Sequence, residues 1–325
     1  MPTDLVRTNA IPVAIYNSLL ALLGLLGLSC SAPQSMRARE ERGNALRVFV
    51  TIFFFGRIAH VRRNPELLIQ TVAPAGKLCW LFAMQRLANK IAIITGASQG
   101  IGRAVAQRFY TEGANLVLAS LPEHDTAENV VKNIGASQDR VMVVEGDLRQ
   151  EDFPKRLFAE TEKRFGAPHI VAAIAGVNMN RPMIETSNDD FDRIFSVNTR
   201  ATFWLFREAA LKIRDGGRIL GVSSNMVLQG RPGVALYAAS KAAVEQFVKI
   251  LAKEVGHRKV TVNAVAPGPT DTAMVSQLSR DTAPAITPLG RLGQPSDIAD
   301  VAAFLVSEDA HWVTGQVIGV NGGIV

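Results

Sequence analysis

The residues of this chain with the clearest capacity for chemistry are a serine, a tyrosine and a lysine in its second half. Ser224 ends an apolar, strand-like stretch, and Tyr237 and Lys241 follow it thirteen and seventeen residues later. Side chains four residues apart share one face of a helix, so the Lys241 ammonium is expected to lie beside the Tyr237 phenol. A neighbouring cation favours the phenolate and lowers the pKa of the tyrosine, which suits the tyrosine to proton transfer. A Tyr-x-x-x-Lys pair alone is also common on solvated helices, so its meaning depends on its surroundings.

A glycine-rich turn far upstream supplies such surroundings. The apolar run Ile91–Thr95 predicts a short buried strand, and Gly96, Gly100 and Gly102 follow it before a pattern at helical spacing that reaches Phe109. A strand, a glycine turn and a helix bring backbone N–H groups and the positive end of a helix against a diphosphate, and glycine permits the close approach. The alternative is an ordinary glycine-rich turn, because three glycines alone are a weak signal.

Taken together, these features resemble the short-chain dehydrogenase/reductase family. Both the spacing Gly-x-x-x-Gly-x-Gly and the order Ser, Tyr, Lys match the family, and the resemblance covers residues 89–325. It implies that Tyr237 donates a proton to a carbonyl oxygen and that Ser224 hydrogen-bonds that oxygen and stabilises its developing charge. Lys241 is implied to lower the pKa of Tyr237 and to hold the nicotinamide ribose.

Two further residues belong to the implied machinery. Asn198 interrupts a helix expected from Phe191 to Lys212, and the family implies that it binds a water which resupplies the proton. The alternative is a buried asparagine satisfied by the helix backbone. Ser223 is the neighbouring rival of Ser224, and its side chain is expected on the other face of the strand.

The resemblance also implies cofactor contacts at the ends of successive strands. Asp147 is implied to hold the adenine ring with the residue after it, although an aspartate there is often only a helix cap. Ala175 and Gly176 keep half of the family's Asn-Asn-Ala-Gly, which puts local hydrogen bonding in question more than chemistry. A Pro-Gly loop is implied to back the nicotinamide, or else it is only a rigid turn. The full set implied for the cofactor is Gly96, Ser98, Gln99, Gly100, Ile101, Gly102, Ser120, Asp147, Leu148, Ala175, Gly176, Asn198, Tyr237, Lys241, Pro267, Gly268, Thr270 and Thr272.

The end of the second strand bears on the choice of cofactor. An acid there would bind the adenosine ribose 2′-hydroxyl and repel a 2′-phosphate, but the strand ends at Ser120. Ser120, His124 or Arg103 is then free to meet a phosphate, which favours NADP over NAD. Glu123 and Asp125 follow closely, and the alternative is that Glu123 reaches back and binds NAD.

Alternating strands and helices from residue 89 predict an α/β fold, a doubly wound, seven-stranded parallel sheet of Rossmann type with the ligand at the carboxyl ends of the strands. We read residues 89–325 as one catalytic domain. Residues 273–289 look irregular and are interpreted as a substrate lid, or else as a plain surface loop. The expected strands are Ile91–Thr95, Asn115–Ala119, Val141–Glu145, Ile170–Ile174, Arg218–Val222, Val260–Val265 and Val317–Val320.

Composition narrows the function classes. The chain has 325 residues, 48% of them hydrophobic, and a net charge of +6. Residues 1–88 hold ten Lys/Arg and four Asp/Glu, a difference of six, so the remainder is neutral and offers no basic face to nucleic acid. The two cysteines, Cys30 and Cys79, both precede the enzyme-like region, which therefore predicts neither a disulfide nor a metal site there.

The first 88 residues read as a hydrophobic extension. Residues 11–28 are apolar enough to be a short membrane segment, and the arginines after them would place the C-terminal side in the cytosol. This reading predicts a cytoplasmic catalytic domain that is membrane-anchored through residues 11–28. A cleaved signal peptide, a disordered leader and a wrongly assigned start remain alternatives.

The resemblance implies an oxidoreductase, and short segments narrow it further. The runs Phe191–Arg200 and Trp312–Gly323 look like the fungal naphthol reductases of polyketide pathways, and nearly as much like plant and fungal aldehyde reductases. We therefore expect an NADPH-dependent reductase of a small-molecule carbonyl substrate, in a homotetramer or dimer joined through the C-terminal part. An NAD-linked alcohol or sugar dehydrogenase and a non-catalytic nucleotide-binding scaffold are the alternatives.

Overall fold

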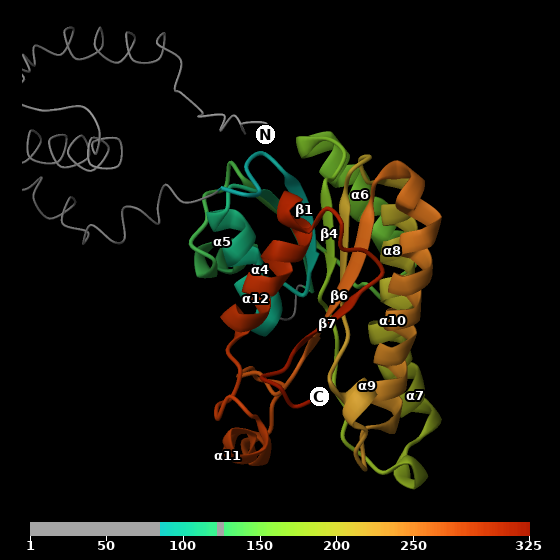
Figure 1. The fold of residues 1–325 in the computed structure, drawn as a ribbon. Coiled ribbons are helices and arrows are strands. Elements are labelled where there is room, and N and C mark those ends of the chain that lie inside the picture. The colour runs from blue at the N-terminus through green and yellow to red at the C-terminus, as the bar shows by residue number, and fades with distance from the viewer. Residues whose placement is uncertain (1–84, 122–126) are drawn as a thin grey trace, which may run out of the picture. The chain divides into compact units, whose positions relative to one another are not determined.

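Seven parallel strands form the centre of the fold (Figure 1). The computed structural model describes residues 85–121 and 127–325. The strands are β1 (Ile91–Thr95), β2 (Asn115–Ser120), β3 (Val141–Glu145), β4 (Ile170–Ala173), β5 (Arg218–Val222), β6 (Thr261–Pro267) and β7 (Val317–Val320). Their order is β3-β2-β1-β4-β5-β6-β7, and every pairing is parallel. The predicted doubly wound sheet is confirmed, and its strands end within two residues of their expected bounds.

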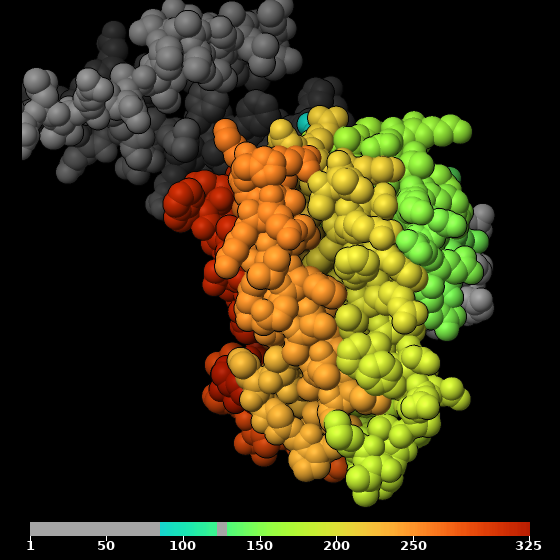
Figure 2. All heavy atoms as spheres, turned by 90° about the vertical axis from the view of Figure 1, so that its right-hand side faces the viewer, coloured from blue at the N-terminus to red at the C-terminus, as the bar shows by residue number. Residues whose placement is uncertain are grey.

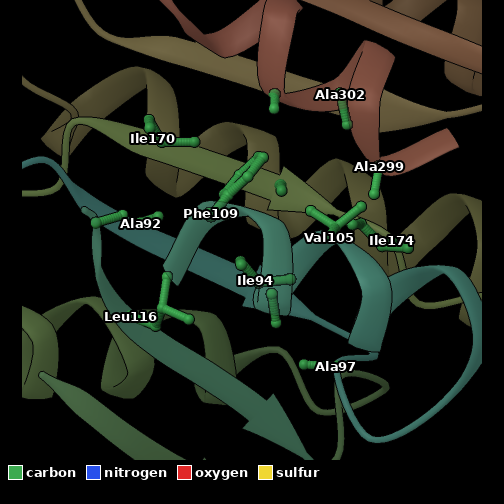
Figure 3. Packing of buried hydrophobic residues seen from close by; sticks show 14 of the residues in the cluster. Ala92, Ile94, Ala97, Val105, Phe109, Leu116, Ile170, Ile174, Ala299 and Ala302 are labelled. Carbon is green, nitrogen blue, oxygen red and sulfur yellow. The ribbon is translucent and has the colours of Figure 1, made fainter. Parts of the chain in front are cut away.

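Helices cover both faces of this sheet, as Figure 1 shows. One layer holds α4 (Gly100–Thr111), α5 (Ala127–Asn133) and α12 (Pro295–Val306), and the other holds α6 (Asp152–Phe165), α8 (Ala201–Lys212) and α10 (Ala235–Val255). Because successive side chains of a strand point to opposite faces, β1 sends Ala92 and Ile94 toward α4 and Ile93 toward the other layer. Figure 3 shows the first of these cores, where Val105 and Phe109 of α4 pack on Ile94 and Leu116.

The order of the strands fixes where a ligand can bind. The chain runs from β1 to β2 on one side and later returns to β4 on the other, so the loops after β1 and β4 diverge. This divergence opens a crevice at the carboxyl ends of the strands, which is where open α/β sheets bind ligands.

Short helices gather around that end of the sheet. Figure 1 places α7, α9 and α11 together at one end of the molecule. Their bounds are α7 (Asn188–Phe195), α9 (Met226–Gln229) and α11 (Gln277–Ile286), and the remaining turns are η2 (Met183–Glu185), η3 (Ser196–Arg200), η4 (Gly256–Arg258) and η5 (Glu308–Ala310).

Two expectations about helices meet different outcomes. The helix expected from Phe191 is interrupted as predicted, by the π-helical turn η3 around Asn198, although Phe191 itself is exposed. The irregular segment expected over 273–289 is wrong in part, because α11 forms within it. Ser276 caps α11 by accepting from the Ser279 N–H at 3.2 Å, and Pro284 is accommodated inside the helix.

The expectations for the N-terminal part lie outside the described residues, including the membrane segment at 11–28. Within residues 85–121 and 127–325, no helix combines the length and the apolar character that a membrane crossing requires. These described residues belong to one compact unit. Its first residues already pack: Leu87 is fully buried in the core, and Arg86 donates to Glu112 Oε2 at 2.9 Å. The predicted domain boundary after residue 88 stays a prediction.

Candidate active site

A cavity of about 800 Å³ opens at the carboxyl ends of the strands. The loops after the first six strands all contribute to its lining, as the crossover between β1 and β4 requires. Every residue of the full set implied for the cofactor and for catalysis lines this cavity except Asn198, whereas Arg103, a candidate for the phosphate, does not line it. The structure therefore brings together, from the loops after six strands and from α10, residues up to 176 positions apart, the separation of Gly96 and Thr272.

The turn between β1 and α4 has the backbone that a diphosphate needs. Gly96 and Gly100 have φ of +69° and +52°, in the left-handed region that favours glycine. A Cβ on Gly102 would lie 1.9 Å from the Gly96 carbonyl oxygen, and one on Gly96 would lie 2.8 Å from the Ala175 Cα. The first turn of α4 carries no acidic side chain, so its N–H groups and helix dipole face the cavity unopposed. This cradle fits the diphosphate of a nicotinamide dinucleotide.

The loop after β6 closes the opposite wall of the same cavity. The Gly268 N–H donates to the Val320 carbonyl at 3.1 Å, and a Cβ on Gly268 would lie 2.8 Å from the Asn321 Cα. A Cβ on Gly100 would lie 3.1 Å from the Thr272 Cγ2, so the glycine turn and the β6 loop approach each other closely. Both segments therefore line one continuous cofactor-sized cleft.

Ser224, Tyr237 and Lys241 converge beside this cleft. Ser224 follows β5, and Tyr237 and Lys241 lie one turn apart at the start of α10. Ser224 and Tyr237 form a side-chain hydrogen bond, and the Ser224 Oγ also accepts from the Met226 N–H at 3.2 Å. The serine hydroxyl and the phenol can thus both hydrogen-bond the same atom of a bound substrate.

The protonation of Tyr237 corrects one expectation. Burial raises the pKa of Tyr237 above its ordinary value of 10, and the hydrogen bond from Ser224 offsets this only in part. The net direction is therefore opposite to the one predicted from the neighbouring Lys241. Its ammonium instead donates to the Val222 carbonyl at 3.0 Å, and burial lowers the pKa of Lys241 itself to about 8.

Asn198 lies behind the cavity rather than in its lining. It is fully buried; its Oδ1 accepts from the Val177 N–H at 2.8 Å and its Nδ2 donates to the Val177 carbonyl at 2.9 Å. A Cβ on Gly176 would lie 3.2 Å from Asn198 Oδ1 and 3.1 Å from Lys241 Nζ, so both side chains approach the same point of the β4 loop. Asn198 therefore holds that loop in place, and its water-binding role stays a prediction.

Ser223 and Ser224 diverge as the strand geometry predicts. The Ser223 Oγ donates to Glu245 Oε1 of α10 at 2.7 Å, whereas Ser224 faces Tyr237. Glu245 is buried and lies one turn beyond Lys241 on the same helix. This bond ties the end of β5 to α10, the two elements that carry the three reactive side chains.

At the adenosine end of the cavity, the structure describes some of the predicted residues and not others. Asp147 lines it as predicted, but its Oδ2 accepts from Arg149 Nε at 2.8 Å, and this hydrogen bond lowers the pKa of the carboxyl. Ser120 is buried in the lining at the end of β2. His124, a candidate for the phosphate, and the acids Glu123 and Asp125 lie outside the described residues.

Sequence reasoning missed some residues of the site. Thr95, at the end of β1, accepts at Oγ1 from the Ile174 and Ala175 N–H groups at 3.0 and 3.2 Å, which supplies the bonding that the missing asparagines put in question. No periodic signal marks a single threonine at the end of a strand. The substrate end of the cavity was also missed, and its lining includes Arg193, Met226, Gln229, Arg231, Val234, Met274, Ser279, Thr282 and Ile286. No His, Cys, Asp or Glu cluster suited to a metal is found in the part of the chain that the structure describes.

A family model and two fungal reductases are similar in sequence to this chain. The model of a family described as enoyl-(acyl carrier protein) reductase matches residues 96–325. Versicolorin reductase 1 of Aspergillus parasiticus is 38% identical over 254 residues, which cover 73% of this chain and 97% of the relative. The hydroxynaphthalene reductase-like protein Arp2 of Metarhizium brunneum is 39% identical over 257 residues, covering 74% and 96%.

Solved structures of short-chain dehydrogenases are also similar to this chain. A short-chain dehydrogenase/reductase of the glucose/ribitol dehydrogenase type from Brucella melitensis has a TM-score of 0.69 and 34% identity, covering 73% of this chain and 97% of its own. A short-chain dehydrogenase from Burkholderia cenocepacia, solved in complex with NADP, has a TM-score of 0.69 and 30% identity, covering 74% and 99%.

Proposed function

The chain belongs to the short-chain dehydrogenase/reductase family and is an NAD(P)-dependent oxidoreductase, and from that premise we propose that it is an NADPH-dependent carbonyl reductase of secondary metabolism. The convergence of Ser224, Tyr237 and Lys241 on the cavity beside the glycine turn carries this proposal. The named activities of the similar fungal proteins, versicolorin reductase and hydroxynaphthalene reductase-like protein, support a polycyclic ketone or its tautomer as substrate.

The side chains divide the work of carbonyl reduction among themselves. When bound, the nicotinamide cofactor supplies the hydride. Ser224 Oγ hydrogen-bonds the carbonyl oxygen and stabilises the negative charge that develops there. Tyr237 donates its hydroxyl proton to that oxygen, and its raised pKa keeps it protonated at neutral pH, which suits the direction of reduction. Lys241, held under the site by the Val222 carbonyl, would bind the nicotinamide ribose.

The preference for NADPH rests on the end of β2. Among the described residues there, Ser120 is a polar side chain without charge, and none is a carboxylate that would repel a 2′-phosphate. Two similar solved structures are complexes with NADP and NADPH, which supports the same choice. Fluorescence titration with NADPH and NADH tests it: we expect tighter binding of NADPH, and tighter binding of NADH would favour an NAD-linked alcohol or sugar dehydrogenase.

Replacing the proton donor tests the catalytic assignment. We expect Tyr237→Phe to reduce kcat on a polycyclic ketone by about 10²-fold or more, because the proton transfer loses its donor, with the affinity for NADPH little changed. Tyr110→Phe, on the outer side of α4 where Tyr110 contacts Ser137, is the matched control and should keep its kcat. Unchanged turnover in Tyr237→Phe would refute the donor. Cofactor binding without turnover of any carbonyl compound by the wild type would instead favour a nucleotide-binding scaffold.

A homo-oligomer is the remaining part of the proposal. Phe203 and Leu211 of α8 and Ile250 of α10 are exposed, and these two helices lie side by side on the face shown in Figure 2. Trp312, before β7, is 91% exposed. Large apolar side chains on a shared face are typical of subunit contacts. Light scattering during size-exclusion chromatography tests this, and a monomer would contradict it.

A further inference from the structure

Two arginines line the substrate end of the cavity without a partner of their own. Arg193 of α7 and Arg231, in the loop between α9 and α10, both line the cavity that holds Ser224 and Tyr237. Neither guanidinium makes a hydrogen bond or an ion pair within residues 85–121 and 127–325. We propose that they bind an oxyanion, a carboxylate or a phosphate ester, on the carbonyl substrate. This inference rests on the proposed reductase function and names the substrate class of the same site.

The chain places both arginines on fixed backbone. Arg193, at an exposed position of α7, lies one helical turn before Val197 of η3, which also lines the cavity. The loop carrying Arg231 is bounded by Gly230 and Gly233, with φ of +51° and +88°. The Gly233 carbonyl accepts from the Arg181 N–H at 2.7 Å, which ties this loop to the segment before α7.

Two carboxylates near the cavity already have partners, and Asp189 and Asp192, on the same helix as Arg193, form no ion pair with it within the described residues. Asp190 accepts from Arg181 Nη1 at 2.5 Å and caps its own helix through the Ser187 N–H, so the nearest ion pair involves a different arginine. Asp147 is the carboxylate that lines the described cavity, and it pairs with Arg149 at the adenosine end. Its charge is thus satisfied away from the substrate end.

The substrate end of the cavity also carries apolar side chains among its polar ones. Met226, Val234, Met274 and Ile286 line this part of the cavity, and Met274 and Ile286 remain about half exposed. Such a pocket favours an apolar body on the substrate, with orientation set by a few polar groups. Arginine presents planar donors that match carboxylate and phosphate oxygens in pairs. The geometry therefore fits an apolar carbonyl compound that carries one acidic group.

A matched set of ketones tests this inference. The set is one bicyclic aryl ketone as its carboxylate, its phosphate ester and its neutral methyl ester, assayed with NADPH and the full-length protein. We expect kcat/KM to be about tenfold or more higher for one of the anions than for the methyl ester, from a lower KM. The anion with the higher kcat/KM shows whether the site prefers a carboxylate or a phosphate ester.

Variants locate the effect. The double variant Arg193→Gln/Arg231→Gln should lose the preference for the anion, so that kcat/KM for the anion falls to that for the methyl ester, and Arg231→Lys should retain part of the preference. Arg200→Gln, an exposed arginine of η3 that does not line the cavity, is the control. Equal kcat/KM for all three ketones, or a preference that survives the double variant, would overturn the inference and leave the reductase function standing.

A binding readout separates the two proposals. Calorimetric titration of the Tyr237→Phe protein with the corresponding carboxylate and methyl ester does not depend on turnover. Tighter binding of the carboxylate that disappears when both arginines are also replaced would support the oxyanion site even if no ketone were reduced. Equal binding of the two ligands would count against it.

Discussion

At the scale of single residues, burial decides more about the reactive groups than their spacing does. The i, i+4 spacing of Tyr237 and Lys241 predicts a lysine that lowers the pKa of the tyrosine. The fold instead buries the lysine under the Val222 carbonyl, lowers its pKa to about 8 and raises the pKa of the tyrosine. A sequence shows which groups share a helix face, but desolvation depends on strands and loops that come from elsewhere in the chain.

The lowered pKa of Lys241 predicts a pH-dependent stability. Folded Lys241 releases its proton near pH 8, whereas the unfolded lysine keeps its proton up to its ordinary value of 10.5. Between these values the unfolded state binds more protons, so the contribution of Lys241 to stability rises with pH, by up to about 1.4 kcal/mol per pH unit. We expect the free energy of unfolding of the wild type, minus that of Lys241→Met, to rise between pH 8 and 10.

Urea unfolding of both proteins across this range measures the difference. Lys253→Met, at an exposed position on the same helix, controls for the loss of a lysine. A difference between wild type and Lys241→Met that stays flat, or falls, would contradict the lowered pKa.

At the scale of elements, the strands and the glycine turn could be predicted from the sequence, and the helix α11 could not. The central strands β1 and β4 are buried on both faces, so each leaves a continuous apolar run in the sequence. The segment 273–289 carries Pro284, which argues against a helix, yet α11 forms there because Ser276 caps it. Thr95 was missed for a related reason: its two backbone hydrogen bonds join strands 79 or more positions apart in sequence, which no local pattern records.

The strand–turn–helix element predicts a sharp intolerance at Gly102. A methyl group there would lie 1.9 Å from the Gly96 carbonyl oxygen, so the backbone of the turn must shift. We expect Gly102→Ala to weaken NADPH binding by about tenfold or more and to destabilise the protein by about 2 kcal/mol. Gly256→Ala, where nothing lies within 4 Å, is the matched control. Dissociation constants from cofactor fluorescence test this, and equal values for both variants would contradict the close packing of the turn.

Helix α11, in the segment that the sequence predicts to be a lid, has a tether that can be removed. Arg280 pairs with Asp271 and donates to the Thr272 carbonyl at 2.7 Å, which fixes the helix to the β6 loop. We expect Arg280→Met to raise the KM for the carbonyl substrate several-fold and to speed proteolysis within residues 273–289, with kcat less affected. Arg291→Met, which breaks an exposed pair with Asp297, serves as the control. An unchanged KM and cleavage pattern would show that the tether does not hold α11.

At the scale of the whole molecule, the described residues form one unit that begins before the motifs do. The sequence places the start of the catalytic domain at residue 89, because the first motif strand begins at Ile91. The structure adds contacts just before that point: Leu87 is fully buried, and its N–H donates to the Glu112 carbonyl at 3.0 Å. Glu112 is itself buried, and its carboxylate accepts hydrogen bonds from both Arg86 and Arg108. Residues with no motif thus complete the packing around the end of α4.

Two fragments separate these starting points. Fragment 85–325 keeps every described contact of the unit, and we expect it to bind NADPH and reduce ketones as the full chain does. Fragment 89–325 loses the burial of Leu87, about 2 kcal/mol, and leaves the buried Glu112 carboxylate with Arg108 as its remaining described partner. It should therefore melt several degrees lower while keeping its site. Thermal unfolding of both fragments, with Leu87→Ala and Arg86→Met in the full chain as controls, tests this. Equal melting temperatures of the two fragments would contradict this prediction and support residue 89 as the start of the domain.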